Sequence, residues 1–179
     1  MIYRYLLVLG YNVKYVRNIT DAGHITNSAG EAVDSIGKAA RQEQMQSLEI
    51  VYKYNVIFQD LQRTYNMLPP SIEPRAAGHI IEQIDMVQQI IDNGLAYEAN
   101  GSVYFDTIKF AEEQKVYGQL SGRKIDDLLV ETRDNLKNQS EKKHPSDFAI
   151  WMRASDDHIL RWNSPWSVGF PGWHLECSA

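Results

Sequence analysis

The most distinctive reactive side chain in this sequence is Cys177, the only cysteine among 179 residues. A cysteine thiolate is a soft ligand that suits zinc, and catalytic zinc sites use three protein ligands and one open position. A single cysteine carries no metal signature, however, and a free cysteine commonly packs as a small hydrophobic residue. The residue type therefore leaves two interpretations, a metal ligand and a buried structural thiol.

Two polar side chains, His174 and Glu176, come just before Cys177. Both residue types bind zinc in proteins. The simpler interpretation is an orienting histidine and a glutamate that faces solvent or pairs locally. Near the other end of the chain, Thr20 and Asp21 follow an apolar run, where such residues often cap the next helix or turn.

The strongest motif is Gly169-Phe-Pro-Gly-Trp-His-Leu-Glu-Cys-Ser178, which accompanies Tyr15-Val-Arg-Asn-Ile-Thr-Asp21 near the start. Together these segments resemble the cysteinyl-tRNA synthetase family of class I aminoacyl-tRNA synthetases, and the resemblance covers most of the chain. It implies that Cys177 binds zinc, together with a cysteine upstream of this sequence and a histidine and a glutamate downstream. It also implies that Thr20 holds the cysteine substrate, and that Trp173 and His174 line the pocket for the amino acid and its adenylate.

The same resemblance implies a ligase that activates cysteine with ATP and magnesium and transfers it to tRNA(Cys). The two class I signatures that bind ATP, of the His-Ile-Gly-His and Lys-Met-Ser-Lys-Ser types, do not occur in this sequence, so we expect the chain alone to be inactive. Residues 22–24 depart from the family pattern. Two alternatives remain, a related ligase that joins cysteine to an amino-sugar and a non-catalytic binding module derived from a synthetase.

Composition limits the other function classes. A formal net charge of −5 disfavours a general phosphate-neutralising surface for nucleic acid. One cysteine cannot form an intrachain disulfide, and no apolar run reaches the roughly 20 residues of a membrane span. We therefore expect a reduced, cytoplasmic protein that does not contact a membrane and is a monomer.

The first half of the chain predicts helices around one strand. Residues 2–9 are apolar enough for a buried helix that Gly10 ends, and 12–19 are typical of a short buried strand. Apolar residues at a helical period predict one long helix over 41–67, followed by a second over 80–91 that ends at Gly94. We expect these two helices to pack together.

The second half of the chain predicts a hairpin and an aromatic core. Asn100-Gly101 is the pair most favoured in a type I′ turn, so 95–99 and 102–106 are expected to form a β-hairpin. Residues 131–146 are charged with few apolar anchors and predict a mobile loop. All four tryptophans follow this loop, and the acidic net charge favours a core role for them over a base-stacking surface.

The fold class expected from these patterns and the resemblance is α/β. Residues 1–29 would belong to a Rossmann-type class I catalytic domain. Residues 30–146 would form an α+β connective insertion with two long helices and the hairpin. Residues 147–179 would return to the catalytic domain and end at the zinc-site motif.

Overall fold

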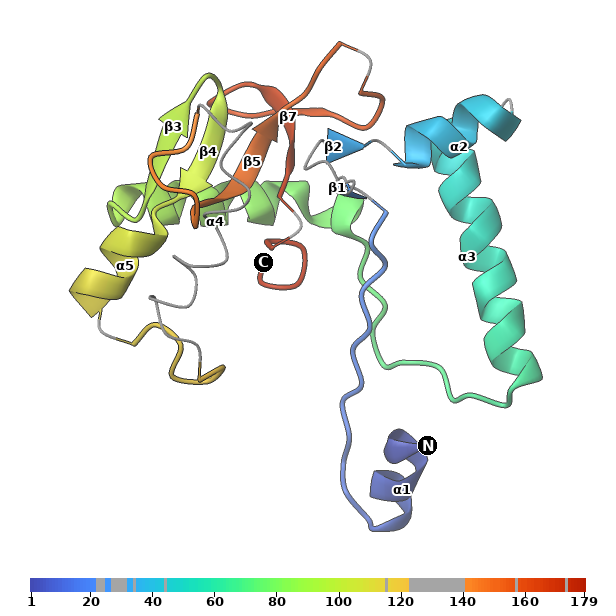
Figure 1. Ribbon diagram of the computed structural model, residues 1–179. Coiled ribbons are helices and arrows are strands. Elements are labelled where there is room, and N and C mark those ends of the chain that lie inside the picture. Colours follow the sequence, from blue (N-terminus) through green and yellow to red (C-terminus); the bar gives the residue numbers. More distant parts are fainter. Residues whose placement is uncertain are drawn as a thin grey trace.

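The computed structural model describes residues 1–21, 25–26, 32–33, 35–43, 45–114, 116–122, 141–156, 158–172 and 174–179. Its helices are α1 (Ile2–Val8), α2 (Ser35–Glu43), α3 (Ser47–Thr64), the 3-10 helix η1 (Ala76–His79), α4 (Ile80–Asp92) and α5 (Thr107–Gln114). Its strands are β1 (Ile25–Thr26), β2 (Ala32–Val33), β3 (Ala96–Ala99), β4 (Ser102–Phe105), β5 (Phe148–Arg153), β6 (Trp162–Asn163) and β7 (Val168–Pro171). We call residues 1–75 the helical region and residues 76–179 the sheet region; Figure 1 shows both.

The sheet region is built on a five-stranded antiparallel sheet in the order β3-β4-β5-β7-β6. Strands β3 and β4 form the predicted hairpin, in which Ala99 pairs with Ser102. Asn100 and Gly101 have φ values of 52° and 81°, as the two central residues of a type I′ turn require. The hairpin prediction is therefore confirmed.

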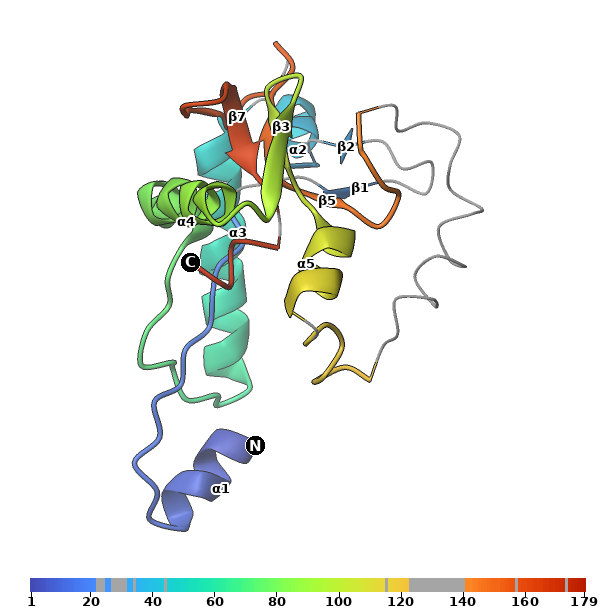
Figure 2. The same ribbon diagram turned by 90° about the vertical axis from the view of Figure 1, so that its left-hand side faces the viewer.

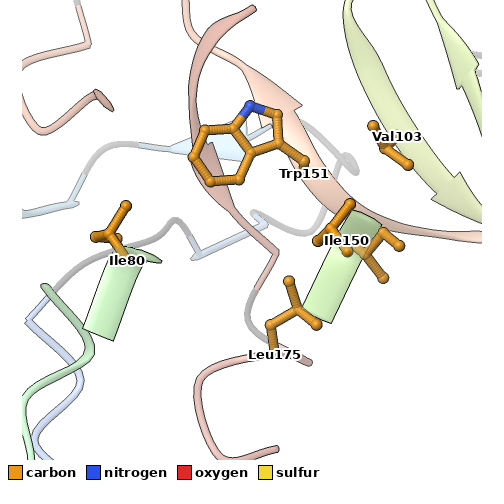
Figure 3. Packing of buried hydrophobic residues seen from close by; sticks show 6 residues of the cluster. Ile80, Val103, Ile150, Trp151 and Leu175 are labelled. Carbon is orange, nitrogen blue, oxygen red and sulfur yellow. The ribbon is translucent and has the colours of Figure 1, made fainter. Parts of the chain in front are cut away.

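Helix α4 packs on this sheet and closes its core. Its apolar stripe buries Ile80 and Val87 against Val103, Ile150 and Trp151, as Figure 3 shows for four of these residues. Full burial of each such side chain stabilises the fold by about 1.5–3 kcal/mol. The helix ends as predicted at Gly94, whose φ is +71°. The N–H of Gly94 donates to Ile91 and that of the next residue to Ile90, which completes a Schellman cap.

The tryptophans of the sheet region belong to the core. Trp151 is fully buried, and Trp162 and Trp166 pack against the same cluster. The rings of Trp151 and Trp166 lie 5.9 Å apart. The core interpretation is confirmed for these three residues, whereas Trp173 lies outside the described residues.

The prediction of one long helix over 41–67 is wrong, because two helices, α2 and α3, occupy this stretch. The helical period of the apolar residues continues across the break, but Glu49 accepts a hydrogen bond from the backbone N–H of Gln46 and so starts a new helix. A Schellman cap closes α3 after Thr64: Asn66 has a φ of 51°, its N–H donates to Arg63, and the N–H of the next residue donates to Gln62.

The predicted packing between the two long helices is also wrong. Helix α3 packs against α2, whereas α4 contacts η1 and strands β3 and β7. Figure 1 shows α3 well apart from α4. The physical reason is that the apolar stripe of α4 is already used by the sheet.

The segment 12–20 is extended, as predicted, but it is not a buried strand. It pairs in parallel with residues 72–75 through two bridges, Val16 with Ile72 and Ile19 with Arg75. Arg17 ties this pair together, because it binds Glu73 at 2.5 Å and lies over the ring of Phe58 in α3. Within the described residues, this is where parallel pairing occurs.

Helix α1 forms where predicted and ends in a Schellman cap at Gly10, with a φ of +83°. Its predicted burial is wrong, because none of its residues is buried in this chain. Both views place α1 far from the sheet, at the end of the extended segment (Figures 1 and 2). An open apolar cavity of about 1170 Å³ lies between α1, residues 13–17 and residues 65–68.

The domain and loop predictions meet the structure only in part. The expected boundary at residue 147 runs between β4 and β5, which are paired in one sheet, so the division into domains stays a prediction. Residues 131–140 of the predicted loop lie outside the described residues. Its end is anchored, because Glu141 accepts hydrogen bonds from Asn100 and Tyr104.

No helix in the described part of the chain is long and apolar enough to cross a membrane.

Candidate functional site

Strand β7, which lies between β5 and β6 in the sheet, contains the start of the predicted site motif, and the rest of the motif follows directly after it. The backbone N–H of Gly172 donates to Ile150 at 2.9 Å, and a Cβ at Gly172 would lie 2.1 Å from the carbonyl oxygen of Ala149. Only glycine fits so close a crossing of two backbones. Residues 174–179 follow as a tight turn, and we call them the C-terminal turn.

One apolar side chain fixes the C-terminal turn to the core. Leu175 is 3% exposed and joins the cluster of Val103, Ile150 and Trp151, as seen in Figure 3. The backbone N–H of Ser178 closes the turn on the carbonyl of Leu175 at 2.8 Å. The residues on either side of Leu175 are therefore held at a fixed place beside the sheet.

Asp21 joins the helical region to the sheet region. It is 2% exposed, and its Oδ1 accepts a hydrogen bond of 2.7 Å from the backbone N–H of Ala77 in η1. Its Oδ2 lies 4.0 Å from Nη1 of Arg75. An aspartate at a helix start satisfies a free N–H and favours the helix dipole. Asp21 therefore caps a helix, but η1 lies far along the chain and is not the next helix or turn that the sequence led us to expect.

Thr20 meets the C-terminal turn through Glu176. The Thr20 hydroxyl accepts a hydrogen bond of 3.2 Å from Nδ2 of Asn18 and lies close enough to the Glu176 carboxyl group to lower its pKa. Glu176 is half-buried, so the expectation that it faces solvent or pairs locally is wrong. The two motifs of the sequence therefore come together in space, at Thr20 and Glu176, as Figures 1 and 2 indicate for the two segments.

The environment of Glu176 favours its neutral form. Burial raises its pKa to about 7, the nearby Thr20 hydroxyl opposes this, and the negative charge of Asp21 adds to it. The Oε1 atom of Glu176 is buried and has no hydrogen-bond partner among the described residues. This carboxyl group is therefore close to half-protonated at neutral pH.

His174 lies at the surface of the C-terminal turn with its ring against the sheet. The centroid of its ring is 4.4 Å from that of Phe148. Burial lowers the pKa of His174, so the imidazole is neutral at pH 7. Its backbone carbonyl accepts a hydrogen bond from the Ser178 hydroxyl.

Cys177 is exposed and carries a free thiol. The buried-thiol interpretation is therefore wrong for this chain. Within the described residues, no cluster of three or more His, Cys, Asp or Glu side chains could hold a metal ion. The described part of this chain does not complete a zinc site around Cys177.

Sequence reasoning placed Thr20, His174 and Cys177 on the two motifs but missed Glu176 and Asn18 as partners of Thr20. Asn18 carries a weak signal, because an amide two residues before a threonine can reach its hydroxyl. Glu176 carries none, because its partner is far away in the sequence. The predicted residue Trp173 is outside the described part of the chain.

Comparison with known proteins matches the sequence of this chain to one family. The family model described as tRNA synthetases class I (C) catalytic domain matches residues 1–179. A protein named cysteine–tRNA ligase from Phocaeicola vulgatus is 54% identical over all 179 residues. Proteins of the same name from Cytophaga hutchinsonii and Deinococcus radiodurans are 53% and 50% identical over the same length.

The match covers all of this chain but only 35–36% of each of these relatives. The chain thus spans about a third of their length. Because the family model covers every residue, the chain belongs to the family of class I tRNA synthetase catalytic domains of the (C) type.

Proposed function

We propose that this chain is part of a cysteine–tRNA ligase, which activates cysteine with ATP and transfers it to tRNA(Cys). The observation that carries the proposal is the 54% identity along the whole chain to proteins of that name. The contact between Thr20 and Glu176 supports it, because it unites the two motifs on which the family resemblance rests.

Each motif residue has a proposed role. Thr20 binds the cysteine substrate, and Trp173 and His174 line the pocket for the amino acid and its adenylate. A neutral imidazole suits this place, since it can hydrogen-bond without repelling the ammonium group of the substrate. We assign no catalytic residue to this chain.

Cys177 is proposed as one of four zinc ligands, the others lying in sequence outside this chain. The exposed thiol supports this, because a ligand must reach a metal held from elsewhere. Bound zinc would accept the thiolate of cysteine and discriminate against serine, whose hydroxyl is a poor ligand. Sites that demand a specific polar contact reach selectivities of about 10⁴ or more, against roughly 10- to 200-fold in apolar pockets.

The remaining parts of the proposal concern the complete enzyme. ATP binds with magnesium through sequence outside this chain, and tRNA(Cys) is the partner. We propose a cytoplasmic monomer. Residues 30–146 would form the connective insertion between two parts of the catalytic domain.

Cysteine-dependent exchange between ATP and pyrophosphate tests the proposal in the full-length protein. We expect exchange with cysteine, none above background with serine, and charging of tRNA(Cys). Cysteine activation followed by transfer to an amino-sugar would instead favour the related ligase. A full-length protein that activates no amino acid would favour a non-catalytic module and contradict the proposal.

Residues 1–179 alone serve as the control. They lack the family's ATP-binding signatures, so exchange should stay at background. Exchange activity that follows the purified chain would contradict the assignment of ATP binding to sequence outside it.

A further inference from the structure

A polar cavity lies at the end of the sheet opposite the C-terminal turn. It has a volume of about 610 Å³, and its walls include the hairpin turn at Gly101, Arg153 at the end of β5, and residues 166–168. We call it the hairpin cavity. Strand β7 runs from this end of the sheet toward the C-terminal turn, as Figure 2 shows. The chain from Val168 to Gly172 spans roughly 13 Å in an extended strand.

Arg153 brings an unpaired guanidinium group to the hairpin cavity. Its backbone is fixed, because its N–H donates to Oγ of Ser102 at 3.1 Å and the residue pairs with Gly169 of β7. Its side chain passes over the hairpin turn, where a Cβ at Gly101 would lie 3.2 Å from its Cδ. Among the described residues, this guanidinium group has neither an ion pair nor a hydrogen bond. Its five N–H donors are therefore available to a ligand.

Arg161 supplies a second guanidinium group, which the backbone holds in place. Its Nη1 donates to the carbonyl oxygens of Ser155 and Asp156, both at 3.2 Å. Its Nε and Nη2 groups donate to no other described residue. Arg161 is therefore fixed by one nitrogen and keeps the other two for a ligand.

Two carboxylates, Glu98 and Asp156, also line the hairpin cavity. The side chain of Asp156 is fully exposed to solvent, and its Oδ1 lies 3.9 Å from Nη1 of Arg161. Water screens so exposed a pair, so it offsets little of the positive charge. Glu98 is exposed on β3 and forms no ion pair with a described residue. It should weaken the binding of an anion, which makes it useful as a test of charge.

We propose that the hairpin cavity binds a phosphate group of an RNA backbone through Arg153 and Arg161. This inference rests on the proposed function, in which tRNA(Cys) is the partner. The planar fork of a guanidinium group matches two phosphate oxygens, and two such groups suit an anion with several oxygens. One local contact agrees with the net charge of −5, which disfavours a general phosphate-neutralising surface. ATP is the other source of phosphate groups, and the experiment distinguishes the two.

The test measures how the full-length protein binds tRNA(Cys). Arg153→Gln should raise the dissociation constant for tRNA, and the KM for tRNA in aminoacylation, about fivefold. The KM values for ATP and cysteine in pyrophosphate exchange should not change. The salt dependence of tRNA binding should become shallower, by about 0.7–0.9 in the logarithmic slope for one lost phosphate contact. Arg153→Lys keeps the charge without the fork and should weaken binding less than Arg153→Gln.

Glu98→Gln should act in the opposite direction. It removes a negative charge from the wall of the cavity, so it should tighten tRNA binding by about twofold. A structural role of the cavity would not improve binding. Arg63→Gln is the matched control, because it removes an exposed arginine that pairs with Asp60 in α3, and it should leave tRNA binding unchanged. Arg153 and Glu98 are exposed, so both variants should fold, which circular dichroism checks.

The outcomes distinguish this inference from the proposed function. No cysteine-dependent exchange by the wild type would contradict the function itself. Normal exchange, with tRNA binding by Arg153→Gln within twofold of wild type, would overturn the phosphate site alone. A rise in the KM for ATP in this variant, without a change for tRNA, would assign the cavity to the nucleotide and also overturn it. Equal or weaker tRNA binding by Glu98→Gln would contradict it as well.

Discussion

The sheet region and the helical region differ in how completely they bury their apolar side chains. In the sheet region, α4 covers the sheet and encloses Val87, Val103, Ile150 and Trp151. In the helical region, the apolar residues of α1 and α3 remain largely exposed, with Tyr52 at 63% and Ile57 at 52%. Helices α1 and α3 are thus specified by local signals, their caps and periodicity, and not by a core of their own.

The two regions meet at a small polar joint. Asp21 caps η1, and Thr20 contacts Glu176 in the C-terminal turn. The joint combines a region with a closed core and a region with open apolar faces. The site residues of both motifs lie at or beside this joint. The motif in the C-terminal turn is held by Leu175 in the sheet core, so its position depends on the stability of the sheet region.

The largest effect is expected from matched isoleucine substitutions in the two regions. Ile150→Ala leaves a cavity in the sheet core and should lower the free energy of unfolding by about 2–5 kcal/mol. Ile57→Ala on the exposed face of α3 should change it by about 0.5 kcal/mol or less. Urea unfolding followed by circular dichroism measures both. Equal losses would show that the helical region has a core of its own.

A second pair concerns the glycine that leads into the C-terminal turn. The Cβ of Gly172→Ala would lie 2.1 Å from a backbone oxygen, so we expect a loss of about 1–3 kcal/mol. At Gly78 the nearest atom to a new Cβ is 3.9 Å away, so Gly78→Ala should be neutral or stabilise by about 0.4–1 kcal/mol. Thermal unfolding compares the two, and a harmless Gly172→Ala would contradict the close crossing of β7 and β5.

The smallest effect is a pH dependence at the joint. The pKa of Glu176 is raised from 4.5 to about 7, so the folded chain holds a proton between these values that the unfolded chain has lost. Its contribution to stability is therefore greatest below about pH 4.5 and falls as pH rises to about 7.

Glu176→Gln does not ionise and should remove this fall. The stability of the variant relative to wild type should rise between pH 5 and pH 8 by on the order of 1 kcal/mol, since solvent screens a half-exposed carboxylate. Ser178→Ala provides the control, whose curve should run parallel to wild type. A constant difference between Glu176→Gln and wild type over this range would exclude the buried carboxylate.

Local features of the fold could be predicted and its long-range contacts could not. The turn at Asn100-Gly101, the stripe of α4 and its stop at Gly94 all depend on residues close in sequence. The break between α2 and α3 was missed because the apolar period continues through it while a single side chain, Glu49, starts a new helix.

For the candidate site, too, local features could be predicted and long-range contacts could not. The motifs identified the residues Thr20, His174 and Cys177, because the family resemblance depends on short runs of adjacent residues. The contact of Glu176 with Thr20 and the cap of η1 by Asp21 join residues far apart, and no periodicity or turn signal encodes them. Burial of α1 was overestimated, because apolar composition does not say what covers a helix.

The proposed role of Cys177, in the C-terminal turn, as a ligand of the zinc that binds the substrate cysteine is tested most directly by Cys177→Ser in the full-length protein. The measurements are zinc content by atomic absorption and the ratio of cysteine- to serine-dependent exchange between ATP and pyrophosphate. We predict about one zinc per wild-type molecule, and a folded variant that has lost both its zinc and its cysteine activation. A variant that keeps its zinc and its preference for cysteine would contradict the assignment of Cys177.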